Sequence, residues 1–263
     1  MLSAAKHLAS AQCPLKSTPP TRNSMQQYFV RLRAFILLLL SLPAFAGKKK
    51  QALPVVRWSD QTPGCTFERG SDGVYRWGLW TSDLGITLAV DSQELTQVTK
   101  RIERPLLLRL TFKYRGPSSV DVTTNNMSLE FVRHSKVIQT SLDPDDFAAR
   151  MQADIQTLED ETEHQMKKHP DQAADKQTPV QNYLSVSTEF QDFLNKNALR
   201  ETRLDSGNNE VSGWVLFSTK SKWIGDWKKQ EEFILRIPFP DRVFEFPFAL
   251  PPTEGDLILR QRD

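Results

Sequence analysis

The chain has 263 residues and a formal net charge of +2, a length that allows one or two domains. Five of its basic residues and none of its acidic residues precede residue 47, which leaves 29 basic and 32 acidic residues in the rest. A nucleic-acid-binding protein concentrates basic residues on one surface. A remainder with a net charge of −3 therefore argues against nucleic acid as a partner.

The N-terminal region has the pattern of a secretory signal peptide. Arg31 and Arg33 precede a mostly apolar run over residues 34–42, and Pro43 separates this run from the small-residue site Ala44-Phe45-Ala46. A basic start, a short apolar run and an A-x-A-like site are the three parts of such a signal. The run is half of the roughly 20 residues that a membrane span needs. A cleaved signal is therefore favoured over an uncleaved anchor.

We expect this signal peptide to occupy residues 25–46, with cleavage after Ala46 and a mature chain over 47–263. Met25 opens a signal peptide of normal length, so residues 1–24 are interpreted as a non-native upstream extension. The expected location is the periplasm or the extracellular space, with no stable membrane span after cleavage.

Beyond residue 51 the apolar residues recur at every second position, which is the period of a half-buried strand. The alternation is clearest over 106–115 and holds over 86–91, 233–239 and 243–248. Further strands are expected over 74–81, 127–132 and 211–218 and from Val120 onward. About seven to nine short strands joined by polar turns favour a mainly β chain, an antiparallel immunoglobulin-like β-sandwich. A β-barrel satisfies the same pattern and remains the alternative.

The middle of the chain is helical in pattern. Asp143 is placed as an N-cap with Pro144 at the first helical position, and basic residues close this helix before Pro170. After a polar linker over 171–177, Thr178-Pro179-Val180-Gln181 fits a capping box that opens a second helix. The apolar stripes are Phe147, Met151, Ile155, Leu158 and Met166, then Tyr183, Leu184, Phe190, Leu194 and Ala198. We expect an inserted αα-hairpin over 143–200 that either caps a sheet or extends past it.

Three segments together resemble a known family. They are Leu106–Gly116 (LLLRLTFKYRG), Val120–Val122 and Ser212–Phe217 (SGWVLF). The combination of an apolar strand, a turn and a second strand with a later Gly-Trp and Phe strand resembles bacterial exported immunoglobulin-like domains of the telokin-like type. The helical insertion departs from their pattern. The resemblance implies an extracytoplasmic sandwich without catalysis of its own, and it transfers no site residues.

Signatures of catalysis and of metal or cofactor binding are missing from the sequence. It contains no G-x-S-x-G, H-E-x-x-H, paired C-x-x-C or phosphate-binding glycine loop. Glu161, Glu163, His164 and His169 gather on the first expected helix, but the spacing of the histidines turns them apart, which favours a solvated face over a metal site. Cys65 is interpreted as a small hydrophobe. We therefore expect no enzyme activity, no cofactor and no metal.

One segment stands out as a candidate interaction surface, because two tryptophans lie among four lysines. Its residues are Lys220, Lys222, Trp223, Trp227, Lys228 and Lys229. These side chains suit binding to a protein partner, a glycan or a membrane surface. The alternative is that the tryptophans pack beneath a loop of this chain and bind nothing.

Two functions remain open after these observations. The favoured one is a non-catalytic interaction or structural module that binds an unknown envelope protein through the helical hairpin or the Trp223/Trp227 loop. The other is a module that binds a glycan or small ligand, with Trp223, Trp227 and Trp80 as an aromatic platform.

Overall fold

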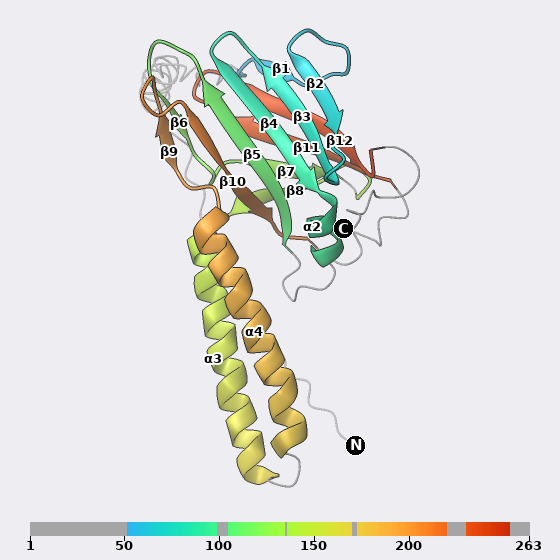
Figure 1. Ribbon diagram of the computed structural model, residues 1–263, viewed down its shortest axis with the longest axis vertical. Coiled ribbons are helices and arrows are strands. Elements are labelled where there is room, and N and C mark those ends of the chain that lie inside the picture. Colours follow the sequence, from blue (N-terminus) through green and yellow to red (C-terminus); the bar gives the residue numbers. More distant parts are fainter. Residues whose placement is uncertain (1–51, 99–104, 135, 170–172, 220–229, 253–263) are drawn as a thin grey trace, which may run out of the picture. The chain divides into compact units, whose positions relative to one another are not determined.

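The computed structural model describes residues 52–98, 105–134, 136–169, 173–219 and 230–252. Over these residues the protein is mainly β, as the alternating sequence predicts, with one large curled sheet and three helices (Figure 1). Among the described helices, none is both long enough and apolar enough to cross a bilayer.

The large sheet has ten strands and consists of two halves. One half runs β1 (Val55–Arg57), β12 (Val243–Leu250), β11 (Glu231–Pro238), β7 (Ser128–Phe131), β8 (Val137–Leu142). The other runs β10 (Glu210–Phe217), β5 (Leu106–Tyr114), β4 (Leu84–Asp91), β3 (Val74–Trp80), β2 (Cys65–Arg69). The halves are hydrogen-bonded where Leu216 and Phe217 of β10 pair with Leu142 and Ser141 of β8. A separate antiparallel ribbon pairs β6 (Val120–Val122) with β9 (Thr202–Leu204).

Within the large sheet, the strand directions depart from the sequence-based expectation at one edge. The described pairs are antiparallel except β1 and β12, which run parallel from Val55 opposite Val243 to Arg57 opposite Glu245. An all-antiparallel sheet is therefore wrong for this pair. A parallel pair requires a long connection, and here nearly the whole described chain lies between the two strands.

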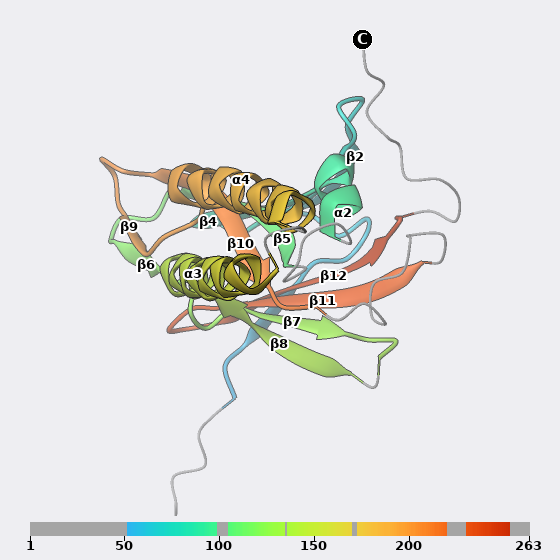
Figure 2. The ribbon, with the colours of Figure 1, turned by 90° about the horizontal axis from the view of Figure 1, so that it is seen from below.

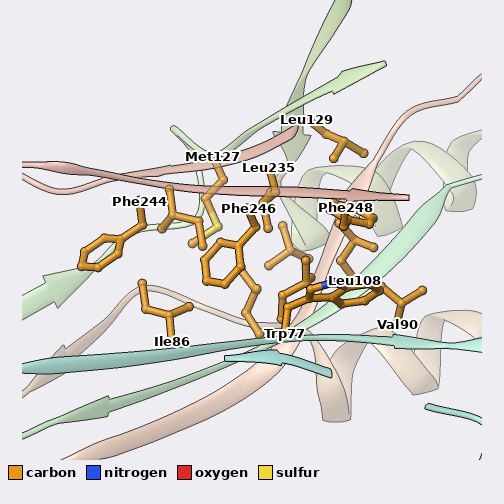
Figure 3. Packing of buried hydrophobic residues seen from close by; sticks show 14 of the residues in the cluster. Trp77, Ile86, Val90, Leu108, Met127, Leu129, Leu235, Phe244, Phe246 and Phe248 are labelled. Carbon is orange, nitrogen blue, oxygen red and sulfur yellow. The ribbon is translucent and has the colours of Figure 1, made fainter. Parts of the chain in front are cut away.

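The curl brings the two halves face to face around the main core, and Figure 2 shows them as separate layers. Figure 3 shows Phe244, Phe246 and Leu235 of one layer directed toward Ile86 and Leu108 of the other, and all five are fully buried. The buried side chains follow the period-two alternation of their strands, which confirms the apolar faces read from the sequence.

The helices are α2 (Ser92–Val98), α3 (Pro144–Lys168) and α4 (Ala173–Asn197). Asp143 caps α3 as predicted, since its carboxylate accepts hydrogen bonds from the backbone N–H groups of Asp145 and Asp146. The start of α4 differs from the one expected from the sequence, because the helix begins at Ala173 and contains Pro179. The prediction that a capping box at Thr178 starts the helix is therefore wrong. The helix extends farther toward the N-terminus because the alanines, the lysine and the glutamine before Thr178 are good helix formers.

Helices α3 and α4 lie side by side, and one end of the pair packs on the outer face of the sheet (Figure 1). Phe147 and Phe190 meet edge to face at 6.1 Å between ring centroids, and Gln191 Nε2 donates to the carbonyl of Ala148. A second, smaller core forms where the pair meets β5 and β10. Its buried members are Leu107, Phe147, Met151, Leu194 and Leu216. On α3 the buried side chains end at Ile155.

Candidate functional site

The candidate site lies where the two ends of the curled sheet come together. Strands β1 and β2 are the terminal strands, and each is hydrogen-bonded to a single neighbour in the described sheet. Most of their side chains are exposed, which is usual for edge strands. The indole N–H of Trp58, just after β1, donates to the carbonyl of Thr66 in β2 at 3.1 Å. This bond joins the two ends at one point and leaves a seam between them.

A cleft of about 820 Å³ opens at this seam. We call it the seam cleft. Its aromatic lining is Trp58, Phe67, Trp77, Phe233 and Phe248. These residues come from both halves of the sheet and from both of its ends, so the cleft exists only because the sheet curls. Its size and apolar lining are those of a binding site for a small molecule or a peptide side chain.

The aromatic rings form a continuous row from the core to the surface. Phe233 and Phe248 are stacked with centroids 5.2 Å apart, and Phe248 lies 5.3 Å from Trp77 across the two layers. Trp77 then lies 5.2 Å from Phe67. Trp77 is 3% exposed whereas Phe67 is 42% exposed. The inner rings are therefore fixed by the core, and the outer ring is available for contact.

Of the charged residues that line the cleft, Arg57 and Glu232 form ion pairs, and Asp60 accepts a hydrogen bond from the backbone N–H of Gln61. The Arg57 guanidinium lies 3.6 Å from the Glu245 carboxylate. Arg133 donates to one oxygen of Glu232 through both Nε and Nη2, at 3.1 and 2.9 Å. Because exposed and paired charges add little attraction for a third group, the apolar rings dominate what the cleft can bind.

Groups with chemical reactivity are sparse near the cleft. His134 Nε2 lies 3.1 Å from the Glu231 carboxylate, and Cys65 on β2 is a half-buried free thiol. The described residues contain no group of three or more His, Cys, Asp or Glu side chains that could hold a metal ion. Of the acidic residues considered from sequence, Glu163 bonds to Lys167 at 2.6 Å, which lowers the pKa of its carboxyl.

The interaction surface predicted from sequence lies outside the described residues, and this applies to Lys220, Lys222, Trp223, Trp227, Lys228 and Lys229. The description resumes at Gln230, whose side-chain amide donates to the carbonyl of Pro251 beside the cleft-lining Pro252. Trp80, the third tryptophan of the expected platform, does not line the seam cleft and instead lies beneath the guanidinium of Arg115 at 5.4 Å.

Comparison of the chain with protein-family models, with curated proteins and with solved structures gives no match.

Proposed function

We propose that the protein is an exported, non-catalytic binding module whose seam cleft holds an extended, apolar peptide segment of an envelope protein. The observation that carries this proposal is the row of aromatic rings that opens between the edges of β1 and β2, each of which pairs with a single strand in the described sheet. The rings supply contact area for apolar side chains, and a strand edge supplies backbone hydrogen bonds. Together these are the elements of peptide recognition by strand addition.

The backbone pairing of the edge strands shows which groups are available. Gly64 and Gly70 flank β2 and bond to β3, since Trp80 N donates to Gly64 O and Gly70 N to Val74 O. Hydrogen-bonding direction alternates along a strand, so the N–H and C=O groups of Phe67 point away from β3. They lie at the edge of the sheet in the described chain. Backbone polar groups require partners, and an added strand provides them.

The finer description of the fold belongs to the same proposal. We interpret the two facing halves of the sheet as an immunoglobulin-like sandwich related to the telokin-like type, and the pair α3 and α4 as an inserted αα-hairpin. What supports the hairpin is the packing of the two helices on one another, with Phe147 of α3 edge to face against Phe190 of α4.

 What supports the sandwich is the core between the layers, where Trp77 faces Phe248 and Phe112 faces Phe239.

Export rests on the sequence pattern at residues 25–46. Amino-terminal sequencing of the protein recovered from the cell envelope tests it, and the expected first residue is Gly47. A chain that still carries residues 25–46 in the envelope would contradict the proposed cleavage.

Peptide binding is tested with short random peptides displayed on phage and selected on the mature chain. We expect enrichment of peptides that alternate apolar and polar side chains, because a strand presents every second side chain to the cleft. A synthetic copy of the strongest peptide is then titrated against Phe67→Ala by calorimetry. Loss of the exposed outer ring should weaken binding about tenfold or more.

The matched control is Ile138→Ala, which also removes a large exposed apolar side chain from a strand, but from β8, away from the cleft. It should bind the peptide as the parent chain does. Failure to enrich any peptide, or equal affinity in both variants, would contradict the proposal. A dimer that forms with rising concentration and is abolished by Phe67→Ala would assign the cleft to a second copy of the chain instead, and would also overturn it.

A further inference from the structure

A second hollow lies on the opposite side of the β2-containing half, on the face of β3, β4, β5 and β10 that points away from the main core. Its volume is about 400 Å³. We call it the outer groove. The residues that give it its chemistry are Asp72, Arg76, Asp91, Arg109, Thr111 and Trp214. Unlike the seam cleft, it is lined mainly by polar side chains, so a different class of ligand suits it.

The two arginines of the outer groove differ in their partners. Arg76 donates to both carboxylate oxygens of Asp72, at 3.3 and 2.5 Å, and this bond is the main cause that lowers the pKa of Asp72 to about 2. Arg76 is therefore neutralised. Arg109 is exposed, and its Nε donates to the hydroxyl of Ser212 at 3.2 Å. Within the described residues no carboxylate forms an ion pair with Arg109. Asp91, the other carboxylate of the groove, accepts a hydrogen bond from the backbone N–H of Gln93 at 2.8 Å and forms no ion pair with Arg109 in the described residues. Arg109 is therefore the cation of the groove that a ligand carboxylate can pair with.

An aromatic ring and hydroxyl groups lie beside this guanidinium. Trp214 stands directly opposite Arg109 in the pairing of β10 with β5. Its ring packs on Phe193 of α4 in a tilted arrangement, with centroids 5.8 Å apart. The hydroxyls of Thr111 and Ser212 lie 2.9 Å from one another on the same face. The groove thus places a flat apolar ring, a planar cation and hydroxyl donors within neighbouring positions of two strands.

We propose that the outer groove binds a saccharide that carries a carboxylate. The C–H face of a pyranose ring packs on an indole, and sugar hydroxyls exchange hydrogen bonds with threonine and serine. The guanidinium of Arg109 matches the two oxygens of a carboxylate in a bidentate pair. This site is independent of the seam cleft, because the two share no lining residue.

The test compares a galacturonic acid trimer with the same trimer after methyl esterification, which removes the charge and keeps the sugar. Binding to the mature chain is followed by the chemical shifts of the tryptophan indole N–H groups in solution. The acid should bind with a millimolar or lower Kd, and the ester at least about tenfold more weakly. Arg109→Gln should lower the affinity for the acid to that for the ester, because it removes the charge.

The matched control is Lys113→Gln, a cation on the same strand and the same face that is already paired with Glu210 at 3.2 Å. It should leave both affinities unchanged. Trp214→Phe, which keeps a ring against Phe193, should weaken binding of acid and ester alike. Circular dichroism shows that each variant is folded. Equal affinities for acid and ester, an Arg109→Gln variant that binds as the parent does, or no binding of the acid up to about 10 mM would each overturn the proposal.

Discussion

Gly213 occupies the position where the chain leaving α4 crosses strand β10. The backbone N–H of Leu199 donates to the carbonyl of Trp214 at 2.8 Å, so the two segments run in direct contact. A Cβ atom at Gly213 would lie 2.6 Å from the Cα and N atoms of Leu199. Real Cβ atoms do not approach backbone so closely, and only glycine fits. This residue therefore fixes how the helix pair returns to the sheet beside the outer groove.

Gly213→Ala should destabilise the protein by roughly 1–3 kcal/mol, because the added methyl group overlaps backbone that cannot move aside. The measurement is the free energy of unfolding in urea. Gly207→Ala is the control, since the nearest atom to its added Cβ is a carboxylate oxygen of Asp205 at 3.4 Å. It should cost less than about 0.5 kcal/mol. Equal losses in the two variants would show that the crossing at Leu199 is looser than described.

At the scale of elements, the helix pair divides into a part that packs on the sheet and a part that does not. Leu107 and Leu216 of the sheet are buried beneath Phe147, Met151 and Leu194. Farther along α3, beyond Ile155, the described side chains are exposed or half-buried. The capping role and the projecting role expected as alternatives are therefore carried by different parts of the same pair.

Shortening the pair should be tolerated. Replacing residues 159–178 by a short Gly-Ser linker keeps the packed part and should change the free energy of unfolding by less than about 1 kcal/mol. Replacing residues 143–200 in the same way exposes Leu107 and Leu216, and should cost at least about 3 kcal/mol or cause aggregation. Urea unfolding and light scattering measure both effects. A full deletion as stable as the short one would mean that the second core contributes nothing.

The sequence predicts those elements that have one face on the core. Leu110, Phe112 and Phe246 are each 0% exposed and alternate with half-buried or exposed residues, so periodicity locates their strands. Strands β1 and β2 are not predicted, because both faces of an edge strand meet solvent. Val55 is 55% and Phe67 42% exposed, and such residues leave no alternating pattern. Helix α2 is too short for a helical period to be visible.

The seam cleft could not be predicted for a different reason. Phe67 and Phe248 belong to opposite ends of the described chain and come together only through the curl of the sheet. No local pattern encodes that curl. The aromatic residues themselves are visible in the sequence, but alternation assigns Trp77 and Phe248 to the core, where their inner faces do lie.

For the whole molecule, one ion pair joins the two layers at their turns. Arg242, in the turn between β11 and β12, donates to both carboxylate oxygens of Asp83, in the turn before β4. The hydrogen bond from Arg242 is the main cause that lowers the pKa of the Asp83 carboxyl below its ordinary value of 3.8. A carboxyl whose pKa is lower in the folded chain stabilises the fold above its ordinary pKa and loses that contribution as the pH falls through the folded value.

Asp83→Asn should therefore destabilise the protein by roughly 1–3 kcal/mol at pH 7, since it removes a charged bidentate partner. The difference from the parent chain should begin to shrink as the pH falls below about 4, where Asp83 of the unfolded chain takes up a proton, and should vanish once the pH is below the lowered pKa of the folded carboxyl. Urea unfolding of both chains between pH 7 and pH values below 4 measures this difference in the free energy of unfolding. Asp241→Asn is the control, because Asp241 is 67% exposed and lies 3.4 Å from the same arginine. A difference that is constant with pH would show that Asp83 acts through shape and not through charge.

The parallel pairing of β1 with β12 also determines when β1 can join the sheet during synthesis of the chain. Val55 is near the start of the described chain and its partner Val243 near the end, so β1 has no strand to join until β12 has been synthesised. Contacts between residues so distant in sequence form slowly, because a long loop must close first. Among the described strands, the last to be synthesised is therefore the one that lets the first join the sheet.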